Sequence, residues 1–546
     1  MIYPVIQNNS LNGKAVNVNS VKVEGDFKET VERIFADYSI DTNGNYTINV
    51  KISDSRKTTY IDELFSLSDE KYFLTVNETC AVIEAATRRG VFRAANTLAK
   101  LIKNRELKCG EAEDYPLFKK RGYIEGFYGN TWERSKRLSV MKLMAQYGMN
   151  TFYYAPKDDI YHREKWRELY PQKELNELKE LFEEAQKHEL DFHWCIGPGL
   201  TYQYTSEDDF NKLIEKFKCV YSIGAKNFGL LLDDIPDEFQ YEKDAEKFDS
   251  IVDAHIYLIN KAYKTLKEFD ADITLTVCPT QYHGNESDYY ITKFGRGIPT
   301  DVTIFWTGAE ICSRVLTSRE ANEFFRSTNH MPLYWDNYPV NDCEMFQEMH
   351  LGPILGRDKD LYKHCEGLIS NVMEYAECSK IPLLTIADYL WNPVCYDSEK
   401  SIKNAHSVIL GDKAELFSYI ADHLAVSCVS RHASEYMSEK LSHIGFLMST
   451  GRQDEAAIEF KDFNAKNREC LEMLNDKTVP MFAEMQKWVN KFSMCCDLLD
   501  AVYTTSLSPT DENKADLASL LEAYNSDAVI LTGFCLREAA EKALLL

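Results

Sequence analysis

Two adjacent carboxylates, Asp233 and Asp234, are the residues whose types and spacing point most directly to acid–base chemistry. They follow the apolar run 228–232, which predicts a strand buried on both faces. Pro236 then ends the strand, because proline has no N–H to give to a neighbouring strand. Neighbouring side chains at a strand end point in roughly opposite directions, so we expect the two acids to occupy different environments. Such a pair can keep one carboxyl ionised and the other protonated near neutral pH.

Further polar residues follow the other strands that the sequence predicts. Short apolar segments at 122–124, 151–154, 192–196, 228–232, 273–278, 302–306, 333–335 and 368–370 are the strand candidates. The residues just after them that could bind or react include Glu125, Gly126, Lys157, Tyr282, Thr307, Asn337, Asp342 and Asn371. A single polar residue at such a position is more often an ordinary loop residue than a catalytic one. The acid pair alone could likewise be solvated loop residues that cap the next helix. Seven strand ends with such residues favour one shared site.

The spacing of the strand candidates predicts the fold that brings these residues together. Amphipathic segments typical of helices lie between most of the strands, at 132–147, 174–188, 207–221 and 245–269. Eight strands separated by crossovers long enough for helices describe an α/β fold of the (β/α)8, TIM-barrel type. A doubly wound open sheet is the alternative, but no glycine-rich phosphate-binding segment follows the first strand. In a barrel, polar residues at the carboxyl ends of the strands meet on one face.

Segments on either side of the barrel predict two further domains. Residues 46–52 and 72–76 alternate between apolar and polar, and 87–103 has one apolar helical face, so we expect a small α+β domain over residues 1–115. The catalytic barrel should occupy residues 116–400. Helical spacing beyond it predicts a helical bundle over residues 401–546, with an apolar stripe made by Phe482, Met485, Val489, Phe492 and Cys496.

Composition argues against several classes of partner. The 546 residues include 86 acidic and 62 basic side chains, a net charge of -24, so neither nucleic acid nor insertion into a membrane is expected. No apolar run reaches the roughly 18 residues of a membrane span, and no signal peptide is visible. Fifteen cysteines without CxxC spacing favour free thiols in a reducing, cytoplasmic compartment; secretion with the signal trimmed is the alternative. The 12 histidines form no metal-binding pattern.

Taken together, these segments resemble the family-84 glycoside hydrolases, the O-GlcNAcase-like β-N-acetylglucosaminidases, in their bacterial form. The matching segments are RGYIEGFYGNTW (121–132), MNTFYYAPKDDIYHREKWRELYP (149–171), LLLDDIPD (230–237), CPTQYHG (278–284), WTG (306–308), WDNYPVND (335–342), LGPILGR (351–357) and SKIPLLTIADYLWNP (379–393). The resemblance is close over about residues 115–400 and looser before them. After them, the sequence agrees with the family in its helical type more than in motif.

The resemblance implies a separate role for each acid. Asp234 would act as the general acid and then as the base, and Asp233 would bind and polarise the N–H of the substrate's 2-acetamido group. Tyr282 and Asn337 would hold the acetamido group and the intermediate that it forms. The side chains implied as walls of the acetyl pocket are Trp335, Thr307 and Tyr282.

Four further positions are implied to bind the hydroxyls of the sugar. Asp342 would bind the 4- and 6-hydroxyls. Lys157, Asn371 and the backbone of Gly126 would hold the side of the sugar that carries the 3- and 4-hydroxyls. The resemblance implies no cofactor and no metal ion.

The rim of the predicted pocket differs from the family pattern at two positions. Val372 stands where bacterial relatives often have proline, and Gln281 stands where glutamate is common. Neither belongs to the acid pair, but both can shift the loops of the rim. Glu125 lies on the same rim, where a hydrogen bond to the loop after the first strand is favoured over a second catalytic acid. Tyr128 and Trp132 are expected to be wall residues.

Adjacent carboxylates suit a reaction in which the substrate supplies the nucleophile. Most glycosidases place two carboxyl groups on opposite sides of the scissile bond, which two neighbouring residues cannot easily do. If the acetamide oxygen attacks instead, one carboxylate can steady the charge on the acetamide nitrogen while the other protonates the leaving oxygen. The resemblance thus implies a retaining exo-β-N-acetylglucosaminidase acting on a glycan or glycoprotein with terminal β-linked N-acetylglucosamine. The alternatives are an endo-acting, hyaluronidase-type glycosidase and a catalytically inactive sugar-binding protein.

Overall fold

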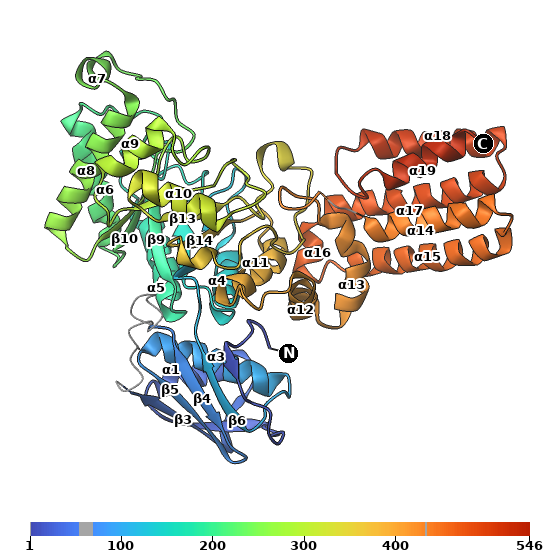
Figure 1. Cartoon of the computed structure of the whole chain (residues 1–546), viewed down its shortest axis with the longest axis horizontal. Helices are drawn as coiled ribbons and strands as arrows, with labels where there is room; N and C mark the ends of the chain where they lie inside the picture. The colour runs from blue at the N-terminus through green and yellow to red at the C-terminus, as the bar shows by residue number, and fades with distance from the viewer. Residues whose placement is uncertain (1, 54–68, 432–433) are drawn as a thin grey trace.

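A closed barrel lies at the centre of the computed structural model, which describes residues 2–53, 69–431 and 434–546 (Figure 1). Within these residues, eight parallel strands close in the order β10-β11-β12-β13-β14-β7-β8-β9. They are β7 (Lys120–Glu125), β8 (Thr151–Tyr154), β9 (Asp191–Ile196), β10 (Asn227–Leu231), β11 (Thr274–Cys278), β12 (Thr303–Trp306), β13 (Pro332–Asp336) and β14 (Gly367–Asn371). The predicted (β/α)8 fold is confirmed, with strand ends displaced by at most two residues.

Burial on both faces explains why these short apolar segments form strands. In β10, Phe228 and Leu230 pack outward against the helices, whereas Leu231 belongs to the cluster that fills the barrel. A Cβ at Gly229 would lie 2.4 Å from the sulfur of Cys195, so glycine makes room for the neighbouring strand's side chain. The interior cluster consists of Ile124, Tyr153, Ala155, Cys195, Leu231, Cys278, Phe305, Leu333, Trp335 and Ile369.

Helices cover the outside of the barrel and differ from the prediction at one place. They are α4 (Arg134–Gln146), α5 (Gln172–Lys187), α6 (Glu207–Tyr221), α7 (Glu242–Lys247), α8 (Ile251–Phe269), α9 (Tyr289–Gly297), α10 (Ser318–Thr328) and α11 (Ala376–Trp391). The single helix predicted at 245–269 is instead α7 and α8, because the chain is extended at Phe248 and Ser250. The crossover from β13 to β14 is a long loop with the 3-10 turns η2 (Cys343–Met345) and η3 (Leu361–Lys363).

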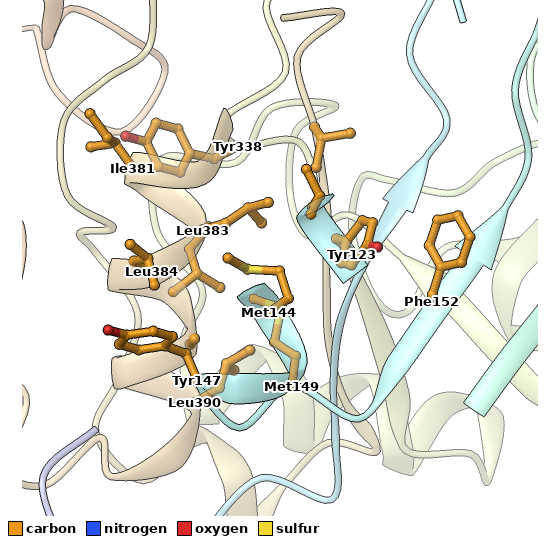
Figure 2. Packing of buried hydrophobic residues seen from close by; sticks show 14 of the residues in the cluster. Tyr123, Met144, Tyr147, Met149, Phe152, Tyr338, Ile381, Leu383, Leu384 and Leu390 are labelled. Carbon is orange, nitrogen blue, oxygen red and sulfur yellow. The ribbon is translucent and has the colours of Figure 1, made fainter. Parts of the chain in front are cut away.

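One apolar core joins the barrel to α11. Figure 2 shows part of it, where side chains from α4, β7, β8 and α11 meet: Tyr123, Met144, Phe152, Leu383, Leu384 and Leu390. The rings of Tyr123 and Phe152 lie 4.9 Å apart between their centroids. Every residue of α11 except Glu377 is buried, because this helix packs against the barrel on one side and the C-terminal helices on the other.

Within the described residues, the N-terminal domain combines a six-stranded sheet with the helices α1 and α3, which agrees with the predicted α+β character. Its strands run in the order β1-β6-β4-β5-β3-β2. They are β1 (Asn8–Asn9), β2 (Ser20–Gly25), β3 (Asp41–Ile52), β4 (Tyr72–Val76), β5 (Cys80–Ala85) and β6 (Gly110–Asp114), and the helices are α1 (Lys28–Asp37) and α3 (Arg88–Lys103). Arg93 of α3 donates to the carbonyls of Ala145 and Met149, so this helix docks the domain on the barrel.

The C-terminal region is helical to its end, also as predicted (Figure 1). Its helices are α12 (Ser398–Leu410), α13 (Ala414–Ala421), α14 (Glu435–Ser449), α15 (Gln453–Leu474), α16 (Pro480–Glu484), α17 (Gln486–Leu507), α18 (Asp511–Ser526) and α19 (Cys535–Leu544). Glu484 accepts hydrogen bonds from the backbone N–H groups of Glu377 and Cys378 at the start of α11, which ties the two regions together. The domain boundaries after residues 115 and 400 stay a prediction.

Two properties of the whole chain complete the description. All fifteen cysteines are free thiols, and Cys343 and Cys395 are exposed rather than buried. None of the helices in the described ranges combines the length and the apolar character that crossing a membrane requires.

Candidate active site

The alternation of the strands explains why polar residues collect above the barrel interior. A residue two positions beyond an interior side chain faces the same way and lies one layer closer to the carboxyl end of the barrel. The interior residues Ile124, Ala155, Leu231, Phe305, Trp335 and Ile369 are followed at this spacing by Gly126, Lys157, Asp233, Thr307, Asn337 and Asn371. Six of the ten predicted site residues therefore owe their position to the period of two in a strand.

All ten predicted site residues line one cavity of about 880 Å³. This volume lies within the range in which proteins bind small molecules. Other residues share the lining, among them Tyr128, Cys278, His283, Ala309, Glu310, Ile311, Cys312, Val340, Cys343, Glu344 and Met345. The cavity thus brings the predicted residues together, and the roles assigned to them stay predictions. Among the described residues, no group of three or more His, Cys, Asp or Glu side chains is placed to hold a metal ion.

Asp233 is the buried member of the acid pair, with 8% of its surface exposed. Its Oδ2 accepts a hydrogen bond from Lys157 Nζ at 2.7 Å. Burial alone would raise the pKa of Asp233, but the charge and hydrogen bond of Lys157, helped by Arg163, outweigh burial and hold that pKa below its usual value. Asp233 is therefore ionised at neutral pH. Lys157 thus forms its ion pair with Asp233, 76 residues away along the chain, although Asp158 and Asp159 are its neighbours in sequence.

Asp234 is the exposed member of the pair. Its φ of 51° is left-handed and turns the chain out of the direction of the strand. The Tyr128 hydroxyl donates to Oδ2 at 2.7 Å, and the Tyr282 hydroxyl donates to Oδ1 at 2.8 Å. Burial and the neighbouring Asp234 raise the pKa of Tyr282, so its hydroxyl keeps the proton that it donates. As expected, the two acids occupy different environments.

A set of amide hydrogen bonds fixes Asn337 in the cavity. Its Oδ1 accepts from Trp335 Nε1 at 3.0 Å and from Asn371 Nδ2 at 2.9 Å, and its Nδ2 donates to the Ile311 carbonyl at 2.8 Å. An amide nitrogen carries two N–H groups, so Asn337 keeps one for a ligand. The Oδ1 of Asn371 is buried and has no hydrogen-bond partner in the described part of the chain. Because burying such an atom without a partner is costly, Asn371 is suited to accept a bond from a ligand hydroxyl.

Asp342 lies in the long loop between β13 and β14 and is partly exposed. Its Oδ2 accepts the backbone N–H of Tyr128 at 2.8 Å, which links this loop to the loop after β7. Burial raises the pKa of Asp342, and the N–H of Tyr128 and the charge of Lys157 offset only part of that effect. The carboxyl therefore faces the cavity with room for a further hydrogen bond.

Close packing forms the apolar wall of the cavity. A Cβ added to Gly126 would lie 2.7 Å from Cζ2 of Trp335, so the ring can approach the backbone only because residue 126 is glycine. Trp335 is 6% exposed and packs edge-on against Phe305, with ring centroids 5.2 Å apart. Thr307 turns its hydroxyl to the carbonyl of Glu310 at 2.8 Å and is itself almost fully buried. These contacts hold the wall rigid.

Glu125 has a structural position, as the sequence favours. It is completely buried and accepts the backbone N–H of Trp132 at 3.1 Å. Arg137 donates two hydrogen bonds to the same carboxylate, at 2.7 and 2.6 Å. Glu125 therefore holds the loop after β7 in place and does not line the cavity.

Two residues beside the acids were missed as functional residues. Tyr128 was expected only as a wall residue, yet its hydroxyl bonds directly to Asp234. Arg163 was not singled out at all, and its guanidinium donates to the Tyr128 hydroxyl and to the Asp234 carbonyl, both at 2.9 Å. The motif around Tyr128 was a signal for the first residue. No sequence pattern marks Arg163, because its role depends on contacts between separate loops.

Comparisons with known proteins identify the family of this chain. A family model described as β-N-acetylglucosaminidase matches residues 121–421, more than half of the chain. The chain belongs to this family of glycoside hydrolases, family 84. Residues 5–115 of this glycoside hydrolase match a second model, described as domain 2 of glycosyl hydrolase family 20. The resemblance stated from the sequence is thereby confirmed, and the chain belongs to a family of enzymes.

Relatives and solved structures extend this comparison. Over 274 residues the glycoside hydrolase is 30% identical to the protein O-GlcNAcases of Rattus norvegicus and Mus musculus. That stretch covers 49% of this chain but only 29% of each relative's length. A mutant of the Thermobaculum terrenum O-GlcNAc hydrolase is 28% identical with a TM-score of 0.75, covering 78% of this chain and 95% of the other. CpGH84B is 26% identical with a TM-score of 0.84 over 100% of both chains.

Proposed function

We propose that this glycoside hydrolase is a retaining exo-β-N-acetylglucosaminidase that works by substrate-assisted catalysis. The observation that carries the proposal is the difference between two neighbouring carboxylates in one cavity. Asp233 is buried and ion-paired with Lys157, whereas Asp234 is exposed between two tyrosine hydroxyls. Neighbouring residues cannot easily flank a sugar from opposite sides, so the nucleophile has to come from elsewhere. In this proposal the 2-acetamido oxygen of the substrate is the nucleophile.

In the first step the acetamide oxygen attacks the anomeric carbon and forms a cyclic intermediate. Asp233, ionised, accepts the acetamide N–H and so directs the acetamide oxygen toward the reacting carbon. Its negative charge stabilises the positive charge that grows on the acetamide nitrogen as the new C–O bond forms. Asp234, protonated, gives its proton to the glycosidic oxygen while that bond breaks, and the aglycone leaves as an alcohol.

In the second step water opens the cyclic intermediate. Asp234, now a carboxylate, removes a proton from the water molecule as its oxygen bonds to the anomeric carbon. The acetamide returns to its original form and Asp234 returns to its protonated state. Each step inverts the anomeric carbon, so the β configuration is retained. The hydroxyls of Tyr128 and Tyr282 stabilise the carboxylate between the two steps.

Binding groups around the cavity support a terminal N-acetylglucosamine as the bound sugar. The remaining N–H of Asn337 suits the acetamide oxygen, and the unpaired Oδ1 of Asn371 suits a ring hydroxyl. Asp342 on the long loop suits the 4- and 6-hydroxyls. The side chains of the barrel interior close the cavity from below, which supports entry by a chain end and hence exo action.

The relatives support the same class of substrate. The curated relatives are named as protein O-GlcNAcases and one solved neighbour as an O-GlcNAc hydrolase. A glycan or glycoprotein that ends in β-linked N-acetylglucosamine is therefore the proposed substrate. A cytoplasmic location stays a prediction.

Hydrolysis of an aryl N-acetyl-β-glucosaminide tests the proposal. We expect release of the chromophore, with the β anomer of N-acetylglucosamine as the first sugar product in a proton NMR time course. An α product would contradict retention. Cleavage of internal bonds in hyaluronan without release of the chromophore would favour the endo-acting alternative, and binding without release would favour the inactive sugar-binding protein.

A further inference from the structure

Arg163 is a partly buried cation next to the acid pair, and the proposed mechanism gives it no task. It lies in the irregular segment between β8 and α5. One guanidinium nitrogen donates to the Tyr128 hydroxyl and another donates to the backbone carbonyl of Asp234, both at 2.9 Å. The guanidinium also lies over the Tyr128 ring, 5.9 Å from its centroid. Three separate loops therefore meet at this one side chain.

We infer that Arg163 is a positioning residue, whose guanidinium joins Tyr128 to the backbone of Asp234 and so holds the Asp234 carboxyl in the geometry for proton transfer. The inference rests on the proposed function, because it gives a task within that reaction. The two carboxylate oxygens of Asp234 accept hydrogen bonds from Tyr128 and Tyr282, whereas Arg163 donates to the backbone carbonyl of Asp234. Its effect passes through Tyr128 on one side and through the backbone on the other.

Arg163 acts on the Asp234 carboxylate first through the Tyr128 hydroxyl. A phenol hydroxyl has one hydrogen to donate. Since Arg163 donates to the Tyr128 oxygen, that hydrogen is directed to the other neighbour, Oδ2 of Asp234 at 2.7 Å. A donor that is itself bonded to a cation is also a stronger donor. Without Arg163, the hydroxyl of Tyr128 can rotate and lose the carboxylate.

Arg163 also acts on Asp234 through the backbone of that residue. Asp234 has a φ of 51°, a left-handed conformation that is unfavourable for residues other than glycine and is tolerated best by Asp and Asn. Such a conformation persists where the surroundings fix it. The hydrogen bond from Arg163 to the Asp234 carbonyl fixes the orientation of that peptide group. The planar fork of arginine makes the two contacts from two separate nitrogens in a fixed geometry, which the single nitrogen of lysine does not reproduce.

The charge of Arg163 also acts on the neighbouring Asp233. Burial raises the pKa of Asp233, and Lys157 lowers it. Arg163 makes a smaller contribution in the same direction as Lys157, and together they hold the pKa below its usual value. Burial lowers the pKa of Arg163, but Tyr128 and the two acids outweigh it, so the guanidinium is charged. The other titratable or charged groups that face Asp233 are Lys157, His162, Cys195, Cys278 and Tyr282. Removal of Arg163 should therefore move the acidic limb of the pH profile to higher pH.

The test compares Arg163→Met, Arg163→Lys and the control Arg319→Met. Arg319 lies on α10 with 75% of its side chain exposed, and its ion pair is with Glu323 of the same helix. For each variant, kcat/KM is measured with aryl N-acetyl-β-glucosaminides of good and poor leaving groups, from about pH 2.5 to pH 9 so that the acidic limb set by Asp233 is covered, alongside the thermal unfolding midpoint. Both sets of substrates are used because a good leaving group departs without a proton and needs little help from the acid.

We expect Arg163→Met to lose at least about tenfold in kcat/KM with the poor leaving groups and much less with the good ones, since general acid help is worth about 100-fold or more. Its acidic limb should move to higher pH. Arg163→Lys keeps the charge but not the fork, so we expect an unshifted acidic limb and a partial leaving-group defect. Arg319→Met should match the wild type. If Arg163→Met does not fold, Tyr128→Phe removes the bridging hydroxyl and should give the same leaving-group defect without the pH shift.

Equal losses for good and poor leaving groups, or a Tyr128→Phe variant without a leaving-group defect, would overturn the inference. An active wild type with an unaltered Arg163→Met variant would overturn the inference alone. A wild type that releases no chromophore from any of these substrates would overturn the proposed function and the inference together. The behaviour of the wild type therefore separates the two failures.

Discussion

At Asp233 and Asp234 the protein gives two identical side chains different surroundings. Strand alternation points Asp233 into the barrel, where Lys157 lies 2.7 Å away, and a left-handed residue turns Asp234 toward two tyrosine hydroxyls. Pairing with Lys157 keeps the first carboxylate ionised, because the opposite charge outweighs the cost of burial. The second carboxylate accepts hydrogen bonds from two tyrosine hydroxyls and lines the open cavity. The division of labour proposed for the pair is therefore a property of the surroundings.

Lys157→Met tests the pairing of Asp233 at the residue scale. It leaves a buried carboxylate without its cation, which should cost about 3–5 kcal/mol of unfolding free energy at pH 7. In the wild type the folded-state pKa of Asp233 is lowered, so the pair stabilises the fold above the unfolded pKa of about 3.9, and this contribution is lost as the pH falls through the lower folded value. In the variant, burial is no longer offset and raises the pKa of Asp233, so stability should recover as the pH falls from 7 toward 5.

Denaturant unfolding at pH 7 and pH 5 measures both effects of Lys157→Met. The double variant Lys157→Met with Asp233→Asn removes the unpaired charge and should regain most of the lost stability. It should remain inactive, because Asp233 is needed for the reaction. A single variant as stable as the wild type at pH 7 would contradict the importance of this ion pair.

Sequence could predict the identity of the site residues better than their partners. Strand ends and the family motifs identified ten of the residues that line the cavity. They did not identify Asp233 as the partner of Lys157, since Asp158 and Asp159 are nearer in sequence. They also missed Arg163, whose contacts join loops that are 35 and 71 residues away along the chain. Such contacts depend on the closure of the whole barrel.

At the scale of elements, the loop after β7 depends on one buried ion pair. Glu125 is completely buried, and the side chain of its partner Arg137 is 12% exposed. Glu125→Gln removes the charge and leaves the guanidinium of Arg137 uncompensated, which should cost about 3 kcal/mol of unfolding free energy. Because Glu125 does not line the cavity, kcat/KM should fall by similar factors for good and poor leaving groups.

The matched control for Glu125→Gln is Glu133→Gln, an exposed glutamate of the same loop that makes no side-chain cap to α4. The control should keep wild-type stability and activity. Denaturant unfolding and a leaving-group series measure the two variants. A steep leaving-group dependence in Glu125→Gln would instead make Glu125 a second catalytic acid.

Element prediction succeeded where burial gives a strong pattern and failed where it does not. The eight barrel strands are short runs of apolar residues, and each was predicted to within two residues. The break between α7 and α8 was missed because the extended residues Phe248 and Ser250 do not interrupt the helical pattern on either side. No helix was predicted between β13 and β14, where the structure has a long loop with 3-10 turns.

At the scale of the whole molecule, a buried charge network joins the N-terminal domain to the barrel. Glu70 is 5% exposed and pairs with Arg93 of α3 and with Arg121 of β7. Asn150 donates a further hydrogen bond to Glu70 at 2.8 Å. Burial opposes the charge, but Arg121 and Arg93 outweigh it and lower the pKa of Glu70 to about 2. The domain therefore contributes to the stability of the barrel that carries the site.

Glu70→Gln tests this interface. It leaves two buried guanidinium groups without their anion, which should cost about 3–5 kcal/mol and lower the thermal unfolding midpoint at pH 7. Because the folded-state pKa of Glu70 is lowered, its contribution is fully present above the unfolded pKa of about 4.3 and is lost as the pH falls toward 2. The difference between wild type and variant should therefore shrink between pH 5 and pH 3. The control is Glu78→Gln, in an exposed ion pair of the same domain, which should change little.

The most direct test of the central claim is a leaving-group series for Asp233→Ala and Asp234→Ala, measured as kcat/KM with and without azide. If Asp234 protonates the leaving oxygen, Asp234→Ala should slow poor leaving groups severely and good ones little. Azide needs no base and should restore activity with good leaving groups. If Asp233 holds the acetamide and balances its charge, Asp233→Ala should slow good and poor substrates by similar factors, and azide should not help. The opposite pattern would reverse the assignment, and full activity in both variants would contradict the account.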